Sequence, residues 1–176
     1  DMTANFAGFA TTGSMKNVEI LDVTNASTLQ RIFDTKGITG LTTLNLDAND
    51  KSFTLSNLAA TGLTANISNA DDTATITIAY APASGTVKAA NDGKADALTV
   101  GLNDVGTVND PSTTANEEKV VKIISEGIET LNVVSNGTAN VVNLDIATTD
   151  VNKEINISGA ADLKVIEIDT TVTSVD

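Results

Sequence analysis

The sequence contains no cysteine and no histidine. Without these residues the chain cannot form a disulfide bond, a thiolate nucleophile, a Ser-His-Asp triad or an imidazole metal site. Tryptophan is also absent and only 3% of the residues are aromatic, which leaves few platforms for stacking bases or sugar rings. The composition therefore disfavours glycan and nucleic-acid binding and most enzyme chemistry, and we expect no catalytic residue.

Basic residues and long apolar runs are also scarce. Lys and Arg total 10 against 23 Asp and Glu, which gives a net charge of -13. Such a surface repels nucleic-acid phosphates and anionic lipids, so cations are the natural partners. The apolar runs are too short to span a bilayer, and the first residues, "DMTANFAGFATTG", lack the features of a signal peptide. We expect no membrane insertion, and any export signal must lie elsewhere.

The length of the chain, 176 residues, suits a single domain with a substantial core. The sequence begins at Asp1 and stops at "TSVD", directly after a strand-like run. We therefore expect residues 1–176 to be one β-rich repeat domain and a segment of a longer surface protein.

Short runs in which apolar and polar residues alternate dominate the sequence. They are rich in β-branched residues and are separated by clusters of Asn, Asp, Gly, Ser and Thr, which favour sharp corners. The runs are "NVEILDV", "LTTLNL", "SFTLSNL", "TATITIAY", "ALTVGL", "ANVVNLDI", "EINIS" and "LKVIEIDT". This pattern predicts an all-β fold.

Two stretches have helical features. In "NASTLQRIFDTKG", Leu29, Ile32 and Phe33 follow the i, i+3, i+4 spacing, with Ser27 as a candidate N-cap and Gly37 as a C-terminal stop. We expect one short helix near residues 28–36. The stretch "NEEKVVKII" (116–124) fits either a helical turn or a strand buried on both faces, and we favour the strand.

One heptamer occurs four times. "NVEILDV" (17–23), "GLTTLNL" (40–46), "GIETLNV" (127–133) and "DLKVIEI" (162–168) share aliphatic residues at places two, five and seven and Asp, Asn or Glu at place six. In a parallel β-helix the aliphatic places of successive turns stack in columns. We expect Leu44 and Leu46 to stack with Leu21 and Val23 and with Leu131 and Val133, and the sixth place to face water or a ladder of Asn and Asp.

The long interval between the second and third heptamers contains the stretch "NDVGTVNDPSTTANEE". This stretch has no clear periodicity, and we expect residues 103–118 to form a protruding loop. The fold class that we predict is a parallel β-helix or β-solenoid with irregular loops.

Three phrases carry a resemblance to a known family. "GIETLNVVSNGTANVVNLDI", "INISGAADLKVIEID" and "GKADALTVGL" resemble the repeat-rich body of RTX-associated, type I-secreted bacterial surface-layer (S-layer) proteins. The resemblance covers the last third of the chain, with weaker echoes from residue 17 to 68. It implies secretion, folding outside the cell with calcium, assembly into a two-dimensional coat, and cell-surface polysaccharide as a partner of other parts of the parent chain. The calcium-roll nonapeptide "GGxGxDxUx" of such proteins does not occur here.

Acidic residues cluster in the expected loops "DANDK", "NADDT" and "NDGKAD". Carboxylate oxygens are the ligands that Ca²⁺ prefers, although no loop has the EF-hand spacing and Asp-rich corners also occur without metal. The candidate calcium ligands are Asp47, Asp50, Asp71, Asp72, Asp92 and Asp96. A solvated acidic surface that keeps an exported protein soluble is the alternative.

A structural segment of a self-assembling, calcium-dependent S-layer explains the repeats, the acidic charge and the resemblance together. An extracellular adhesin or host-binding β-domain is the alternative, but it is expected to expose an aromatic or apolar patch, and the Phe and Tyr residues are scattered. A polysaccharide-acting enzyme is disfavoured because Arg31 is the only arginine. We therefore expect a secreted, non-enzymatic protein at the cell surface that associates with other copies of itself.

Overall fold

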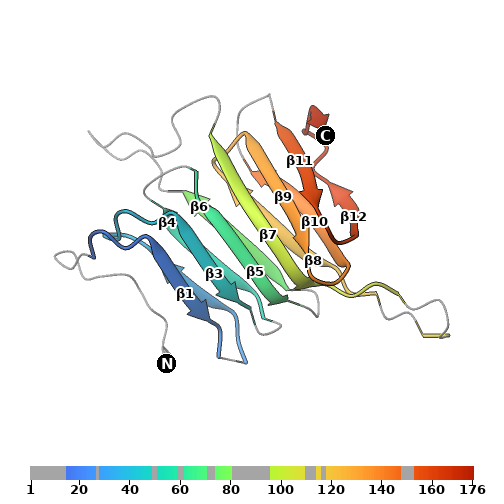
Figure 1. Ribbon diagram of the computed structural model, residues 1–176, viewed down its shortest axis with the longest axis horizontal. Helices are drawn as coiled ribbons and strands as arrows, with labels where there is room; N and C mark the ends of the chain where they lie inside the picture. Colours follow the sequence, from blue (N-terminus) through green and yellow to red (C-terminus); the bar gives the residue numbers. More distant parts are fainter. Residues whose placement is uncertain are drawn as a thin grey trace.

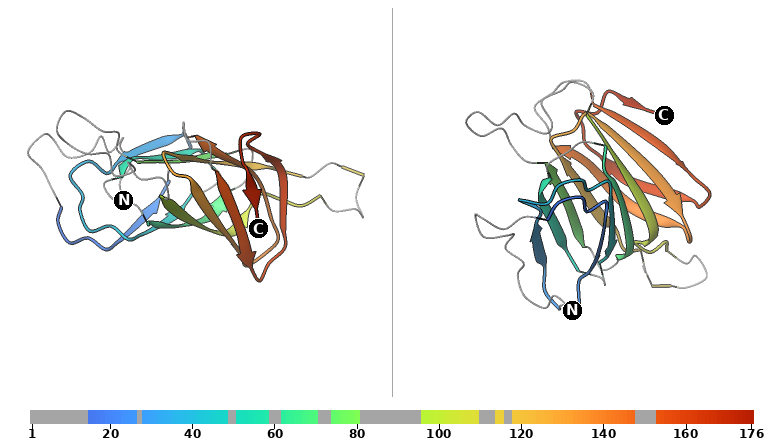
Figure 2. Two further views of the ribbon diagram at one scale, coloured as in Figure 1. Left: turned by 90° about the horizontal axis from the view of Figure 1, so that it is seen from above. Right: turned by 60° about the vertical axis from the view of Figure 1, so that its left-hand side comes forward.

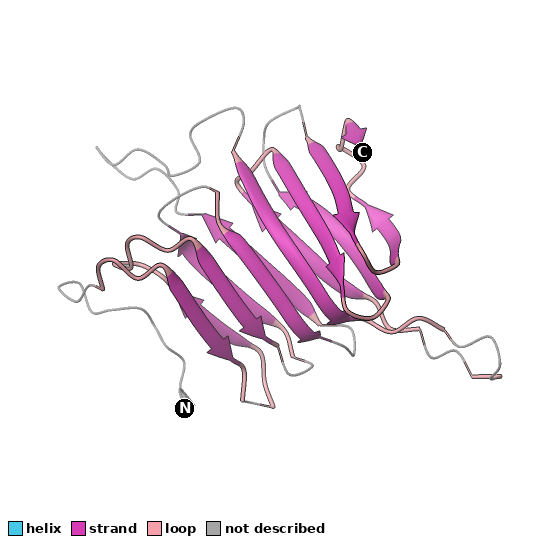
Figure 3. Cartoon of the chain, viewed as in Figure 1, coloured by secondary structure: helices cyan, strands magenta, loops and turns pink. Residues whose placement is uncertain are grey.

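The computed structural model describes residues 15–26, 28–48, 51–58, 62–70, 74–80, 96–109, 114–115, 118–147 and 153–176. Within these ranges the fold is all-β: every regular element is a strand, and Figure 3 shows no helix among them. None of the described elements is a helix long and apolar enough to cross a membrane.

The strands form two parallel sheets. The seven-stranded sheet contains β1 (Ile20–Thr24), β3 (Thr43–Asp47), β5 (Thr64–Ala70), β7 (Ala97–Val105), β9 (Thr130–Asn136), β11 (Glu154–Gly159) and β13 (Ser174–Val175), in that order. The six-stranded sheet contains β2 (Arg31–Asp34), β4 (Phe53–Leu58), β6 (Thr75–Tyr80), β8 (Val121–Glu126), β10 (Asn140–Ala147) and β12 (Leu163–Ile168). Consecutive strands therefore alternate between the two sheets (Figure 1).

A regular spacing underlies this alternation. Side-chain hydrogen bonds between neighbouring strands of one sheet join residues 21, 23 or 24 positions apart along the chain. Longer connections precede β7 and β8: the register partners Thr64 of β5 and Thr99 of β7 lie 35 positions apart, and Ala97 of β7 and Thr130 of β9 lie 33 positions apart. The insertions change the length of a connection but leave the strand order unchanged.

The core lies between the two sheets, which face each other in Figure 2. The alternation in sequence explains why: in β3, Leu44 and Leu46 point inward and alternate with half-buried residues, and in β6, Ile76 and Ile78 point inward from the other sheet. These side chains are at most 1% exposed. Burial of apolar surface, at roughly 25 cal/mol per Å², is the main force that holds the sheets together.

The helix predicted near residues 28–36 is wrong, because this stretch contains β2. Phe33 is 3% exposed and points into the core, whereas Ile32 is 54% exposed and Leu29 is 63% exposed. The chain alternates its faces with a period of two, as a strand does, and it pairs in parallel with β4. The strand that we favoured within 116–124 is confirmed, because β8 begins at Val121.

The heptamer columns are partly confirmed. Leu21 pairs in register with Leu44, as predicted. Further along the sheet, however, the column that contains Leu44 continues through β5 to Val100 of β7 and then to Val133 of β9. We predicted Leu131 in this column, so the predicted register is wrong by two residues. A shift of two residues keeps the same side chains inward, so the alternation alone cannot detect it.

The fourth heptamer, residues 162–168, does not stack with the other three. It contains β12, which lies in the six-stranded sheet, whereas the other heptamers contribute β1, β3 and β9 to the seven-stranded sheet. Its sixth residue, Glu167, faces Asn143 of β10 and accepts a hydrogen bond of 3.3 Å from the Asn143 amide.

Left-handed backbone conformations shape the corners, as the Asn, Asp and Gly clusters predicted. Among the described residues, the non-glycine residues with positive φ are Asn17, Asn57, Asn69 and Asp104, and the last three are the second-to-last residues of β4, β5 and β7. Gly40 has a φ of 93°, and a Cβ there would lie 3.2 Å from the Cα of Asn17. This glycine therefore allows the corner before β3 to stack closely on the corner before β1.

The stretch 103–118, expected as a loop, begins within a strand. Asn103 to Val105 belong to β7, so the expected lower boundary is three residues too early. Residues 110–113 and 116–117 of this stretch lie outside the described ranges. Beyond the strand, Thr107 and Lys119 form an antiparallel bridge with backbone hydrogen bonds of 2.9 and 3.0 Å. Glu118, next to this bridge, forms an ion pair with Lys164 of β12.

Candidate functional site

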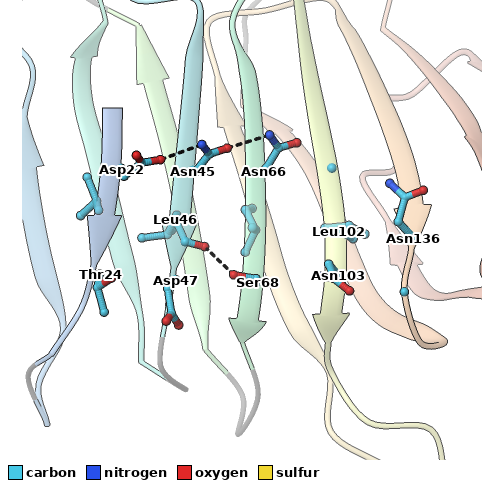
Figure 4. Close-up of a pocket in the computed structure, with 14 residues that line it drawn as sticks. Asp22, Thr24, Asn45, Leu46, Asp47, Asn66, Ser68, Leu102, Asn103 and Asn136 are labelled. Atoms are coloured by element: carbon cyan, nitrogen blue, oxygen red, sulfur yellow. Dashed lines mark hydrogen bonds between the residues drawn. The ribbon is translucent and has the colours of Figure 1, made fainter. Parts of the chain in front are cut away.

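The outer face of the seven-stranded sheet carries a polar groove that crosses β1, β3, β5, β7 and β9 (Figure 4). Two rows of side chains form its walls. The first row, which we call the amide row, consists of Asp22, Asn45 and Asn66 and ends at Gly101. The second row, which we call the mixed polar row, consists of Thr24, Asp47, Ser68, Asn103 and Asn136. The groove has a volume of about 560 Å³.

The parallel register builds these rows. Since residues in register on neighbouring strands lie about 4.8 Å apart, equal positions of successive strands form a straight file. Alternate side chains point outward, so one inward residue per strand separates the two rows. In β3 that residue is Leu46, whose side chain is 1% exposed and whose backbone contributes to the floor of the groove.

Hydrogen bonds order the amide row. The Asn45 amide donates to the Asp22 carboxylate at 2.7 Å, and the Asn66 amide donates to the Asn45 side-chain oxygen at 2.8 Å (Figure 4). Asp22 and Asn45 are the sixth residues of the first two heptamers, so the predicted ladder of Asn and Asp is confirmed for these two heptamers. The third heptamer supplies a separate pair, in which Asn156 donates to Asn132 at 3.0 Å.

Two glycines accommodate the groove's asparagines. A Cβ at Gly101 would lie 2.5 Å from Oδ1 of Asn66, and a Cβ at Gly137 would lie 1.8 Å from Oδ1 of Asn103. Each asparagine therefore leans over the next strand into space that only glycine leaves open. The amide row ends at Gly101 because this position supplies no further side chain.

The groove offers side chains that form hydrogen bonds. Its side-chain lining consists of hydroxyls, amides and the carboxylates of Asp22 and Asp47. The Ser68 hydroxyl donates to the Leu46 carbonyl at 3.3 Å, and Asp47 accepts a hydrogen bond from Asn69 at 3.2 Å. A nucleophile requires an adjacent base, and Ser68 directs its proton to a backbone carbonyl instead.

Of the predicted calcium ligands, Asp47 and Asp96 lie in the described ranges, whereas Asp50, Asp71, Asp72 and Asp92 lie outside them. Asp47 ends β3 and is in register, through Ser68, with Asn103 of β7. Asp96 immediately precedes β7, so about 20 Å of strand separates the levels of the two carboxylates. They cannot hold the same ion, and no group of three Asp or Glu side chains suited to a metal occurs among the residues described.

Asp96 instead takes part in a corner of the fold. Its backbone N–H donates to the Glu129 carboxylate at 2.9 Å, and its carbonyl accepts from the backbone N–H groups of Glu129 and Thr130, each at 3.0 Å. Glu129 is only 3% exposed. Since unpaired charges are rarely buried, these bonds indicate that Glu129 fastens the entry to β7 against the entry to β9.

A buried ion pair lies near the C-terminal end of the sheets. Lys153 is 5% exposed, and its ammonium donates to the Asp169 carboxylate at 2.8 Å, to the Ile146 carbonyl at 2.6 Å and to the Thr171 hydroxyl at 2.5 Å. The hydrogen bond from Lys153, aided by the Thr171 backbone, lowers the pKa of Asp169 from 3.8 to about 2. This cluster ties the turn after β12 to the end of β10 and the start of β11.

The sequence did not predict Asn66, Gly101, Gly137 or the Lys153–Asp169 pair. The alternation in "TANISNA" indicates the strand that carries Asn66, but it does not indicate which asparagine of another strand lies beside it. The roles of the glycines and of the ion pair depend on contacts between residues that are distant in sequence. A local sequence pattern therefore does not predict them.

Comparisons with known proteins found no matching protein-family model, no matching curated protein and no matching solved structure.

Proposed function

We propose that this chain is a structural segment of a bacterial S-layer, built as a β-solenoid whose stacked coils form part of a self-assembling, calcium-dependent coat at the cell surface. The observation that carries this proposal is the unbroken strand order of both sheets: each strand pairs in parallel with the strand two positions along the chain. One complete coil then corresponds to two strands. Such stacking produces a stiff, extendable body, which suits a scaffold.

The distribution of burial supports a structural role. Strands β3 to β10 bury their inward residues almost completely, and side-chain files on the outer face reinforce the backbone pairing. The outer positions contain mostly Thr, Asn and Ser, which present a hydrated surface for contacts between molecules. We propose that this segment has no enzymatic activity and acts outside the cell, where other copies of the chain are its partners.

Calcium has a physical role in such an assembly. Two copies with a net charge of -13 repel each other within a Debye length, about 8 Å at physiological salt. A divalent ion that binds carboxylates from both surfaces removes this repulsion more effectively than monovalent ions screen it. The acidic loops that contain Asp47, Asp50, Asp71, Asp72, Asp92 and Asp96 are the proposed ligands.

An extracellular adhesin or host-binding domain is the second candidate. The observation that favours it is the polar groove, which crosses β1, β3, β5, β7 and β9 and presents amide groups at the spacing of the strands. An extended ligand with regularly spaced hydroxyl or amide groups fits this arrangement. An adhesin of this kind would bind its ligand as a monomer and would be indifferent to calcium.

Electron microscopy of the purified protein with and without millimolar Ca²⁺ separates the two candidates. We expect ordered sheets with Ca²⁺ and dispersed particles with EDTA, and equal Mg²⁺ as the ionic control should not replace calcium. Dispersed monomers in both conditions would contradict the coat. Calorimetric titration provides the second measurement: saturable heat that survives ~0.15 M NaCl supports specific calcium sites, whereas heat that disappears with salt indicates diffuse screening.

A further inference from the structure

The polar groove ends at Asn136, the last residue of β9, and at Gly137, which follows it. This is the only place in the sequence where glycine follows asparagine. Both residues are exposed, and Gly137 has a φ of 70° in the corner between β9 and β10. Within the described ranges the Asn136 side chain forms no hydrogen bond, and Figure 4 shows no bond between its amide and the other groove residues. The groove thus contains one asparagine whose amide is exposed and not held in place.

An asparagine that precedes glycine can react with its own backbone. The backbone nitrogen of Gly137 attacks Cγ of Asn136, a C–N bond forms, and the bond between Cγ and the amide nitrogen breaks. The amide nitrogen leaves as ammonia, which carries away the proton of the Gly137 N–H, and a cyclic imide (succinimide) remains. One water molecule then opens the ring at either carbonyl carbon and gives aspartate or isoaspartate. The sum is hydrolysis of one amide, without oxidation or reduction.

The residue after the asparagine decides how easily the ring closes. Glycine has no Cβ, so its nitrogen can approach Cγ and the backbone beside it can rotate. Asn66 gives the contrast: it is also exposed, but Ile67 follows it and its amide donates to Asn45 at 2.8 Å. A β-branched neighbour crowds the nitrogen, and the hydrogen bond fixes the amide against the adjacent strand. Among the described asparagines, Asn136 alone combines a following glycine with an unpaired amide.

Asn140 controls how easily this corner opens. Its side chain is buried, and its amide donates to the carbonyl oxygens of Asn136 at 3.1 Å and of Thr138 at 3.0 Å. Ring closure requires rotation of the peptide group between Asn136 and Gly137, which breaks the first of these bonds. A single hydrogen bond of this kind changes an equilibrium by about tenfold at most. The fold therefore slows the reaction and does not prevent it.

We infer that Asn136–Gly137 is a site of spontaneous covalent modification, at which the folded protein deamidates to aspartate and isoaspartate. The modification adds one negative charge to the mixed polar row, at the end of the groove. This inference goes beyond the proposed coat function and does not depend on it, because the reaction needs only water and the residues of one corner.

The two products have different consequences for the fold. Aspartate leaves the length of the backbone unchanged and occupies nearly the same volume as the amide that it replaces. Isoaspartate routes the backbone through the side-chain carbon, which inserts a methylene before Gly137 and removes the original Asn136 carbonyl from the main chain. Asn140 then cannot keep its bonds to both carbonyl oxygens. We therefore expect the isoaspartate form to melt below the unmodified protein, and the aspartate form to melt close to it.

Peptide mapping by mass spectrometry tests the site. The folded protein and the guanidinium-unfolded chain are incubated at physiological pH and then digested with trypsin. Cleavage after Lys122 and Lys153 gives one peptide that also contains Asn132, Asn140 and Asn143 as internal controls. We expect the amide-to-acid mass increase at position 136 alone, with two products that separate by chromatography. The rate in the folded protein should lie within about tenfold of the rate in the unfolded chain, and it should rise with pH because the attacking nitrogen must lose its proton.

Two variants complete the test. Asn136→Gln should abolish the mass increase in this peptide, because glutamine must close a larger ring. Asn136→Asp reproduces one product, and its melting temperature compared with that of the aged protein separates the effect of the charge from that of the isoaspartate backbone. A folded protein that stays unmodified while the unfolded chain reacts completely would overturn the inference. Equal modification at Asn132 or Asn143, or a mass increase that persists in Asn136→Gln, would also overturn it.

Discussion

Truncation of Leu131 to alanine tests the stacking of inward side chains at its most enclosed point. Leu131 is 0% exposed in β9, and its register partners Leu98 and Ile155, from β7 and β11, are also 0% exposed. Apolar neighbours on both adjacent strands and the facing sheet surround the side chain. The backbone of these strands is fixed by parallel pairing, so the surroundings cannot easily collapse into the space that the truncation leaves.

The expected loss of unfolding free energy is roughly 2 to 5 kcal/mol, because Leu→Ala removes buried methyl groups and leaves a cavity. The upper half of that range is favoured by the fixed strand pairs on both sides. For a protein of this size each kcal/mol corresponds to a change of about 2 to 4 °C in melting temperature. The variant should therefore melt about 5 to 20 °C below the wild type.

Urea unfolding followed by the β-sheet signal in circular dichroism measures this loss. Val134→Ala is the matched control, because Val134 lies on the same strand but points outward and is only half-buried. It should cost less than about 1 kcal/mol. A loss below about half a kcal/mol for Leu131→Ala, or equal losses for the two variants, would refute the assignment of Leu131 to the core.

Three further changes probe the register, the amide row and the buried ion pair. Thr99→Cys with Asn132→Cys should form a disulfide bond on oxidation, detectable by mass spectrometry, because these outward residues are register partners; a pair that stays reduced contradicts the register. Gly101→Ala should cost about 1 kcal/mol in urea unfolding, since its Cβ displaces the Asn66 side chain, and truncating Asn66 as well should recover most of that loss. Asp169→Asn should destabilise the protein at neutral pH. Because the folded-state pKa of Asp169 is lowered from 3.8 to about 2, the stabilisation is present above the unfolded-state pKa and is lost as the pH falls through the folded-state pKa, so calorimetry should show the difference shrinking towards pH 2.

Much of the strand content was predictable because alternation is a local property. Strands such as β3 and β6 show one inward and one outward residue in turn, and their sequences record this directly. The failure at β2 has a physical cause. Leu29, Ile32 and Phe33 have helical spacing, but only Phe33 is buried, because pairing with β4 decides the conformation of this stretch. A tertiary contact overrides a local preference in such a case.

The candidate site was predictable only in part. The sixth place of the heptamers identified Asp22 and Asn45, since a shared position in repeated phrases implies neighbouring strands. The register beyond the long connections was not predictable, because columns shifted by two residues have the same pattern of buried and exposed positions. The position of Asn66 over Gly101 follows from that register, so it required the structure.

The identity of the residues in the amide row reconciles an acidic chain with close stacking. Carboxylates in a file about 4.8 Å apart would repel each other by about 1 kcal/mol per neighbouring pair in water, and by more where solvent is partly excluded. In the row itself a single carboxylate, Asp22, accepts from Asn45, and Asn45 accepts from Asn66, so Asn45 both donates and accepts without adding charge. Asn at the interior strands thus keeps the hydrogen-bonding capacity of Asp while it removes the repulsion. On β3 and β7, Asp47 and Asp104 lie at or next to a strand end, where water and cations reach their carboxylates and screen the charge.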